Sequence, residues 1–227
     1  MRELIDLNRK FNTVSDAIRH LQNGGFIILS DNESRENEGD LVALADKVSP
    51  QTIHEMLKEA NGLMCVPVNE EIAHRLGFKD MVAHSTDPNQ TPFMITVDGN
   101  EEKTGVTTGV SAFDRAATIY RIANPDATAG DFNHPGHIQP LIAKTKGIRE
   151  RTGHTEASVD LAYLSNSAPV TVIIEVLKED GHMARRDDLF ELADKLRVPY
   201  ITIGEIADFM DEHHVEYAAE LEASTLN

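Results

Sequence analysis

The chain has 227 residues, of which 41% are hydrophobic and 26% are charged, and it carries a formal net charge of −17. This composition is typical of a globular protein. We expect a single domain over residues 1–227, because mixed domains of about 200 residues are common. The negative charge disfavours a nucleic acid partner, whose phosphates it would repel.

No apolar run approaches the ~18 residues that cross a membrane, and the N-terminus lacks the hydrophobic core of a signal peptide. Cys65 is the sole cysteine, which excludes an intramolecular disulfide and suits a reducing compartment. We therefore expect a cytoplasmic protein with no membrane partner.

Capping residues and apolar periodicity predict alternating helices and strands. Helices are expected to begin at Thr13, Ser49, Asn69, Ser111, Gly153 and Asp187, with one more after the last strand. Strands are expected over 26–29, 41–45, 63–68, 93–97, 141–143, 170–177 and 200–203. Polar residues predict a mobile loop over 84–91, and prolines and glycines predict an irregular segment over 124–139. This order favours a layered α/β or α+β domain.

The connection between the first two expected strands, residues 31–40, is unusually acidic. It places five carboxylates around Arg35, at a point where a sheet ends. Carboxylate oxygens are preferred ligands of Mg2+, so the segment is a candidate metal site. A solvated surface charge run is the commoner explanation for such a segment taken alone.

Three further features carry candidate chemistry. Glycines and hydroxyl groups over 104–111 lead into Ser111 and Asp114, whose spacing is that of a capping box, and such a helix start sometimes holds an anion. The basic segment 144–151 is a candidate phosphate contact. His154 opens a helix, and Glu175 lies in an apolar strand, where an unpaired carboxylate would be costly. Each feature alone has a structural explanation, such as a core histidine or a paired acid.

Taken together and in this order, the motifs resemble the 3,4-dihydroxy-2-butanone 4-phosphate synthase family. The resemblance runs from about residue 17 to 206 and is most specific at segments 35–40, 107–111 with 114–115, 135–137, 153–157 and 183–185. It implies a homodimeric α+β fold, a single layered domain whose mixed sheet is covered by helices. It also implies a lyase of riboflavin biosynthesis that converts D-ribulose 5-phosphate to L-3,4-dihydroxy-2-butanone 4-phosphate and formate.

The resemblance assigns roles to individual positions. It implies that Glu36 and His154 bind Mg2+ or Mn2+. It implies that the phosphosugar contacts Arg35, Glu36, Asp40, Thr108, Arg151, Thr152, Gly153, His154, Thr155 and Glu175. It implies that His137 and Glu175 are catalytic, and our hypothesis is that Asp40 and Glu175 share the proton transfers while His137 assists. Asp31 and Glu33 are expected to have no role, and the role of Glu38 is left open.

The chain departs from the family pattern at Asn133-His134, Gln139 and 146–149, which concern loop conformation and phosphate contact. Many relatives carry a GTP cyclohydrolase II domain, whose length and zinc ligands are not expected within these 227 residues, so a monofunctional form is expected. Two alternatives to this function are another metal-dependent phosphosugar isomerase or lyase, and a catalytically inactive homologue that acts as a regulatory subunit. The retention of five chemically demanding residues argues against the second: Glu36, Asp40, His137, His154 and Glu175.

Overall fold

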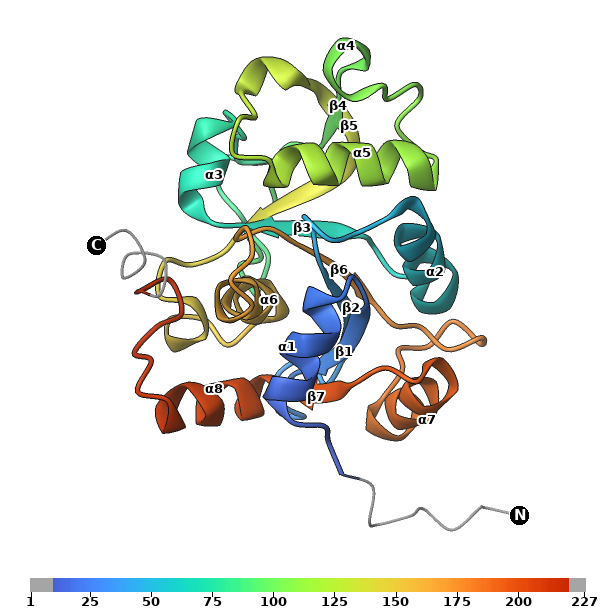
Figure 1. Cartoon of the computed structure of the whole chain (residues 1–227), viewed down its shortest axis with the longest axis vertical. Helices are drawn as coiled ribbons and strands as arrows, with labels where there is room; N and C mark the ends of the chain where they lie inside the picture. The colour runs from blue at the N-terminus through green and yellow to red at the C-terminus, as the bar shows by residue number, and fades with distance from the viewer. Residues whose placement is uncertain (1–9, 221–227) are drawn as a thin grey trace.

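A computed structural model describes residues 10–220 of the chain, which fold around one mixed sheet in the order β4-β5-β3-β6-β2-β1-β7 (Figure 1). The strands are β1 (Phe26–Ser30), β2 (Gly39–Leu44), β3 (Cys65–Val68), β4 (Val97–Gly99), β5 (Phe132–Ile142), β6 (Thr171–Glu175) and β7 (Tyr200–Thr202). The helices are α1 (Val14–Gln22), α2 (Pro50–Ala60), α3 (Glu70–Arg75), α4 (Glu101–Thr104), α5 (Ala112–Ala123), α6 (His154–Leu164), α7 (Arg186–Leu196) and α8 (Ile203–Glu212). The expected α+β class is confirmed, while a single domain over all of residues 1–227 stays a prediction.

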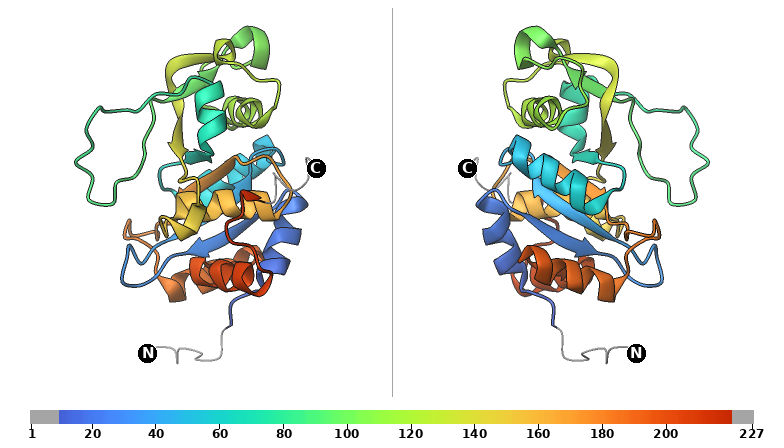
Figure 2. Two further views of the ribbon diagram at one scale, coloured as in Figure 1. Left: turned by 90° about the vertical axis from the view of Figure 1, so that its left-hand side faces the viewer. Right: turned by 90° about the vertical axis from the view of Figure 1, so that its right-hand side faces the viewer.

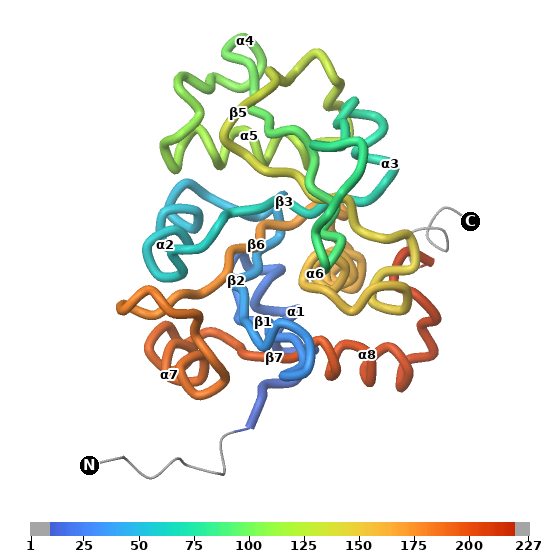
Figure 3. The backbone as a smooth tube through the Cα atoms, turned by 180° about the vertical axis from the view of Figure 1, so that it is seen from behind, coloured from blue at the N-terminus to red at the C-terminus, as the bar shows by residue number. Residues whose placement is uncertain are grey.

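Helices cover both faces of the central strands. The core cluster that contains α2, α5 and α7 packs against one face, and the cluster that contains α1, α6 and α8 packs against the other. Figure 1 shows α2 and α7 on one side of β1 and β2 with α6 and α8 on the other, and Figure 3 shows the same arrangement from behind. Strands buried on both faces explain why the apolar runs at 26–29 and 41–44 show no alternation with polar residues.

The predicted helix starts are largely confirmed. Thr13, Ser49, Asn69 and Ser111 each accept a hydrogen bond from the backbone N–H of the third residue that follows. Only one of the two hydrogen bonds of the capping box expected at Ser111 is present, the one that Ser111 accepts from the backbone N–H of Asp114. The Asp114 carboxylate turns away from the cap and accepts hydrogen bonds from the backbone N–H groups of Thr107, Thr108 and Gly109.

Two predicted segments differ from the structure. Residues 124–139 were expected to be irregular, but β5 begins at Phe132 because its backbone pairs with β4 and, further along, with β3. This tertiary pairing overrides the local signal of Pro135, Gly136 and Pro140. The strand expected over 93–97 is reduced to isolated bridges at Phe93 and Met94, and β4 begins only at Val97.

The loop between α3 and β4 projects from the body of the molecule, as Figure 2 shows, and it contains the predicted loop 84–91. Despite this projection, Asn89 contacts both Glu36 and Arg151. Across residues 10–220 no helix is both long and apolar enough to cross a membrane.

Candidate active site

A cavity of about 110 Å³ lies where β2, β3 and β6 meet the start of α6 and the acidic loop. It is lined by Arg35, Glu36, Glu38, Asp40, Cys65, Thr91, Phe93, Leu141, Arg151, His154, Thr155, Ile173 and Glu175. Seven of the residues predicted from the sequence therefore meet in one place, although they come from segments more than 100 residues apart. Four predicted residues, Thr108, His137, Thr152 and Gly153, are not part of this lining.

Asp31 holds the acidic loop in shape. Its side chain is 1% exposed and pairs with Arg35 at 2.9 Å. It also accepts hydrogen bonds from the backbone N–H groups of Glu36 and Glu38, both at 3.0 Å. The expectation that Asp31 has no role is therefore wrong, because this buried carboxylate fixes the loop that carries Glu36.

Arg185 also holds this loop, through two hydrogen bonds to its backbone. Its Nη1 donates to the carbonyl oxygen of Glu36 at 3.0 Å and to that of Asn37. Asn37 has a positive φ of 55°, which turns these two carbonyl groups toward the guanidinium. The motif at 183–185 was part of the sequence resemblance, but its structural purpose was not predicted.

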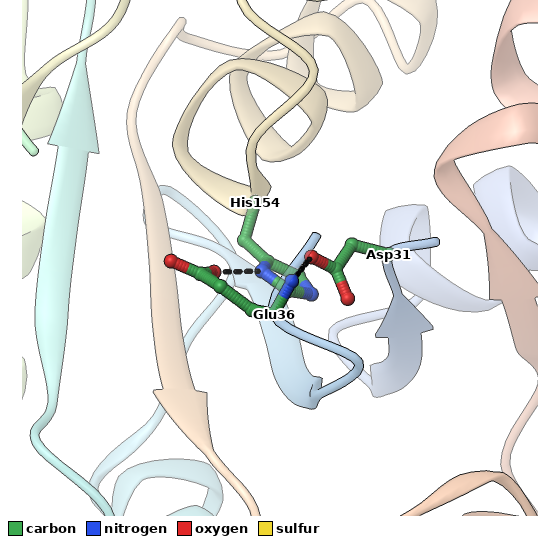
Figure 4. Close-up of side chains that lie close together, drawn as sticks. All are labelled: Asp31, Glu36 and His154. Carbon is green, nitrogen blue, oxygen red and sulfur yellow. Dashed lines mark hydrogen bonds and ion pairs between the residues drawn. The ribbon is translucent and has the colours of Figure 1, made fainter. Parts of the chain in front are cut away.

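Asp31, Glu36 and His154 form a group whose ligand atoms lie within 4.8 Å of one another (Figure 4). His154 Nδ1 is 3.7 Å from Glu36 Oε2. His154 Nε2 is buried and has no hydrogen-bond partner within residues 10–220. An unpaired buried ring nitrogen beside carboxylates fits a site that binds a divalent cation, because the lone pair of a neutral imidazole and the carboxylate oxygens can all coordinate such an ion.

The charges of this group depend on one another. The neighbouring His154 ring, with help from Arg35, lowers the pKa of Glu36 to about 2 against the effect of burial. Burial alone would lower the pKa of His154, but the carboxylates of Asp40, Glu36 and Asp31 raise it to about 9. Glu36 and His154 therefore favour each other's charged forms.

Asp40 and Glu175 line the cavity and come from the adjacent strands β2 and β6. Glu175 Oε2 accepts a hydrogen bond from the backbone N–H of Leu63 at 2.7 Å. Gly62 permits this approach, because a Cβ there would lie 2.6 Å from Glu175 Oε2. Burial, together with the nearby carboxylates, raises the pKa of Asp40 to about 7, although His154 opposes this.

A second cluster lies outside the cavity and contains the other catalytic candidate. His137 Nδ1 is 2.7 Å from Asp98 Oδ2, and Asp98 Oδ1 accepts the backbone N–H of His137 at 2.9 Å. The turn that contains Thr108 packs here, since a Cβ on Gly109 would lie 2.2 Å from Asp98 Oδ2. Asp98 was not predicted, and no sequence motif pointed to it.

Comparisons with known proteins agree with this geometry. A family model described as 3,4-dihydroxy-2-butanone 4-phosphate synthase matches residues 15–209. The riboflavin biosynthesis protein RibBA of Bacillus mycoides (strain KBAB4) is 44% identical over 212 residues, which are 93% of this chain and 52% of that protein. RibBA of Bacillus cereus (strain B4264) is 43% identical with the same coverage. The chain thus spans about half the length of these curated relatives.

Two solved structures are also similar. A crystal structure of 3,4-dihydroxy-2-butanone 4-phosphate synthase in complex with two magnesium ions has a TM-score of 0.85 and 34% identity, covering 91% of this chain and 100% of that one. RibBX of A. baumannii, a two-domain 3,4-dihydroxy-2-butanone 4-phosphate synthase, has a TM-score of 0.83 and 38% identity, covering 88% of this chain and 58% of that one.

Proposed function

Because the chain belongs to the 3,4-dihydroxy-2-butanone 4-phosphate synthase family, we propose that it converts D-ribulose 5-phosphate to L-3,4-dihydroxy-2-butanone 4-phosphate and formate in riboflavin biosynthesis. The main support is the single cavity that joins two cationic side chains, a histidine and several carboxylates. The reaction divides five carbons into four and one without an oxidant. Carbon–carbon bonds must migrate and break, and the water lost in dehydration is taken up again when formate is released, so the site must supply proton transfers, an electrophile and a phosphate contact but no oxidant.

Glu36 and His154 would hold the divalent cation, Mg2+ or Mn2+, with the Asp31-anchored loop fixing Glu36. When bound, the cation stabilises negative charge on adjacent oxygens of the sugar, which lowers the barrier to enolisation. His154 must be neutral to act as a ligand, so its ring gives up the proton that the surrounding carboxylates otherwise hold there.

Asp40 and Glu175 are suited to the proton transfers of enolisation, dehydration, skeletal rearrangement and the loss of formate. Asp40 has a pKa of about 7, so it can accept and return a proton near neutral pH. Glu175 is oriented by the Leu63 N–H. The two acids thus have different environments, which is useful when successive steps need an acid and a base.

Arg151 and the start of α6 would bind the phosphate of the sugar. The Arg151 guanidinium lines the cavity, and Thr155 lies in the first turn of α6, where backbone N–H groups have no partner inside the helix. Thr152 and Gly153 connect the two and complete the proposed contact. Arg35, beside Glu36, would contact the sugar oxygens.

We further propose a cytoplasmic homodimer in which the His137 cluster faces the cavity of the other copy. Arg115 of α5 donates a hydrogen bond to the His137 carbonyl oxygen. The same helix exposes two large apolar side chains, Phe113 (67%) and Tyr120 (55%). Covering this apolar surface would stabilise a dimer. A mixture of the Glu36→Gln and His137→Ala variants would then recover activity that neither has alone, whereas a monomer in light scattering at micromolar concentration would contradict the dimer.

Product analysis tests the proposed function. Incubation with ribulose 5-phosphate and Mg2+ should give a formate signal in the NMR spectrum. Consumption of substrate without formate would instead indicate a phosphosugar isomerase or another lyase. No turnover of ribulose 5-phosphate with either Mg2+ or Mn2+ would indicate an inactive homologue.

A further inference from the structure

The carboxylate of Glu156 is not part of the cavity lining, but it pairs with Arg151, which is. Glu156 is 0% exposed, and its Oε2 accepts a hydrogen bond from Arg151 Nη1 at 2.6 Å. The Arg151 side chain is 15% exposed, so the guanidinium bridges the interior and the cavity. A buried, charge-assisted bond of this kind restricts where a long and otherwise mobile side chain can point.

Gly153 shapes the space in which this ion pair sits. A Cβ at position 153 would lie 2.3 Å from Arg151 Nη1 and 2.9 Å from Glu156 Oε2. No real Cβ approaches other atoms so closely, so any larger residue would push the two side chains apart. The absence of a side chain at Gly153 is therefore part of what places the guanidinium.

The same helix anchors the basic loop at two more points. Glu156 Oε1 accepts the backbone N–H of Lys144 at 3.3 Å, and Asp160 Oδ2 accepts that of Ile148 at 2.8 Å. Glu156 and Asp160 are one turn apart on α6, whose first residue is His154. Helix α6 consequently carries the proposed metal ligand at its start and holds the loop that ends in Arg151.

Two other donor atoms of Arg151, Nε and Nη2, are held by a weaker partner that a ligand could replace. Its Nε and Nη2 both donate to the carbonyl oxygen of Asn89, at 3.4 and 3.2 Å. These are long bonds from two parallel N–H groups to one neutral oxygen. A phosphate presents two charged oxygens to the same fork and would bind it more strongly.

We propose that Glu156 is a positioning residue: it holds Nη1 of Arg151 so that Nε and Nη2 remain available to bind a phosphate group in place of the Asn89 carbonyl oxygen. The inference rests on the proposed function only in naming the phosphosugar as the natural ligand. It also gives Gly153 a second role beside the proposed phosphate contact, since Gly153 makes room for the ion pair.

The test uses inorganic phosphate as the probe and the full chain loaded with Mn2+. Isothermal titration should show that Glu156→Gln binds phosphate about tenfold more weakly than the wild type, because the charge-assisted bond that orients Arg151 is lost. Mn2+ affinity should stay within threefold. In turnover, KM for ribulose 5-phosphate should rise about tenfold with kcat changed less than threefold.

Asp160→Asn is the matched control, because it makes the same acid-to-amide change on the same helix and the same loop without touching the guanidinium. Its phosphate affinity should stay within twofold of the wild type. Gly153→Ala keeps every charge but displaces the ion pair, so it should also weaken phosphate binding. This variant carries the test if Glu156→Gln does not fold.

Unchanged or tighter phosphate binding in Glu156→Gln would overturn the proposal, because Glu156 would then merely neutralise Arg151. A parallel loss of phosphate and Mn2+ affinity would also overturn it, since that result indicates general damage to the start of α6. A wild-type protein that binds phosphate but forms no formate would refute the proposed function while leaving this inference intact.

Discussion

Asp40 of β2 and Glu175 of β6 lie directly opposite each other in the antiparallel register of the sheet. Side chains at such positions have Cβ atoms only about 5 Å apart, and like charges there repel. Glu175 has a backbone donor for its carboxylate, whereas Asp40 Oδ1 is buried without a partner among residues 10–220. Burial, together with the nearby carboxylates, raises the pKa of Asp40 to about 7, so Asp40 can take a proton near neutral pH.

Asp40→Asn should lower kcat by a factor of about 10² to 10⁴, because an amide of the same shape cannot accept the substrate proton. The wild-type kcat/KM should fall toward acid pH as Asp40 becomes protonated. Because activity requires a bound cation, whose positive charge favours the carboxylate, this fall should lie below pH 7. Rates of formate release from pH 5.5 to 9 check both statements. Activity within tenfold of wild type, in a variant that still binds Mn2+, would remove Asp40 from the proton transfers.

Glu36→Gln and His154→Ala should each weaken Mn2+ binding at least tenfold, because each removes one of the protein ligands we propose. Electron paramagnetic resonance of bound and free Mn2+ measures this directly. Glu33→Gln is the control, because Glu33 is an exposed acid on the same loop. This variant removes one negative charge, as Glu36→Gln does, but leaves every proposed ligand in place. Equal weakening in all three variants would mean that general negative charge, rather than a defined site, attracts the cation.

Asp31→Asn should weaken Mn2+ binding about tenfold even though we do not propose Asp31 as a ligand. The amide loses the ion pair with Arg35 and at least one of the bonds to the Glu36 and Glu38 backbone, so the loop no longer holds Glu36 in place. The expected cost in the free energy of unfolding is about 1–3 kcal/mol, measured by urea denaturation. Unchanged stability together with unchanged Mn2+ affinity would show that the loop keeps its shape without this anchor.

Asp160→Asn should stabilise the protein at alkaline pH. Burial raises the pKa of Asp160 to about 7, so the folded state binds its proton more tightly than the unfolded chain does. Stability contributed by this group is therefore lost as the pH rises from about 4 to about 7, by roughly 4 kcal/mol at most. Urea denaturation at pH 8 should show the variant to be more stable by roughly 2–4 kcal/mol, and the difference should vanish near pH 4.

Asp126→Asn, on the surface, provides the comparison for Asp160→Asn, and its effect should stay within about 0.5 kcal/mol. A variant at Asp160 that is equally destabilised at both pH values would show that the carboxylate is required for the Ile148 contact itself.

Local signals in the sequence were sufficient to locate most helices and the central strands. Helix starts with a polar cap, such as Ser49-Pro50, and uninterrupted apolar runs such as 26–29 depend on neighbouring residues alone. The β5 strand could not be predicted in this way. Its prolines and glycines indicate a loop, and only pairing with β3 and β4, distant in sequence, gives it an extended conformation.

In the candidate site, too, some features can be predicted from neighbouring residues, whereas others depend on contacts between distant segments. Glu36 and His154 lie in recognisable motifs, and Glu175 stands out as a carboxylate in an apolar strand, but the partners that orient cavity residues carry no such signal. Asn89, in an exposed loop, contacts Glu36, and Asp98 pairs with His137. These contacts depend on how distant segments meet, so a single sequence carries no signal for them.

One measurement tests the proposed activity most directly: the NMR time course of ribulose 5-phosphate and formate for wild-type protein, Glu36→Gln and Glu33→Gln, each with Mg2+ and then with excess EDTA. The wild type and Glu33→Gln should release one formate for each ribulose 5-phosphate consumed, only with Mg2+, and Glu36→Gln should release almost none. Loss of ribulose 5-phosphate without formate, or formate release that persists in EDTA, would contradict the account.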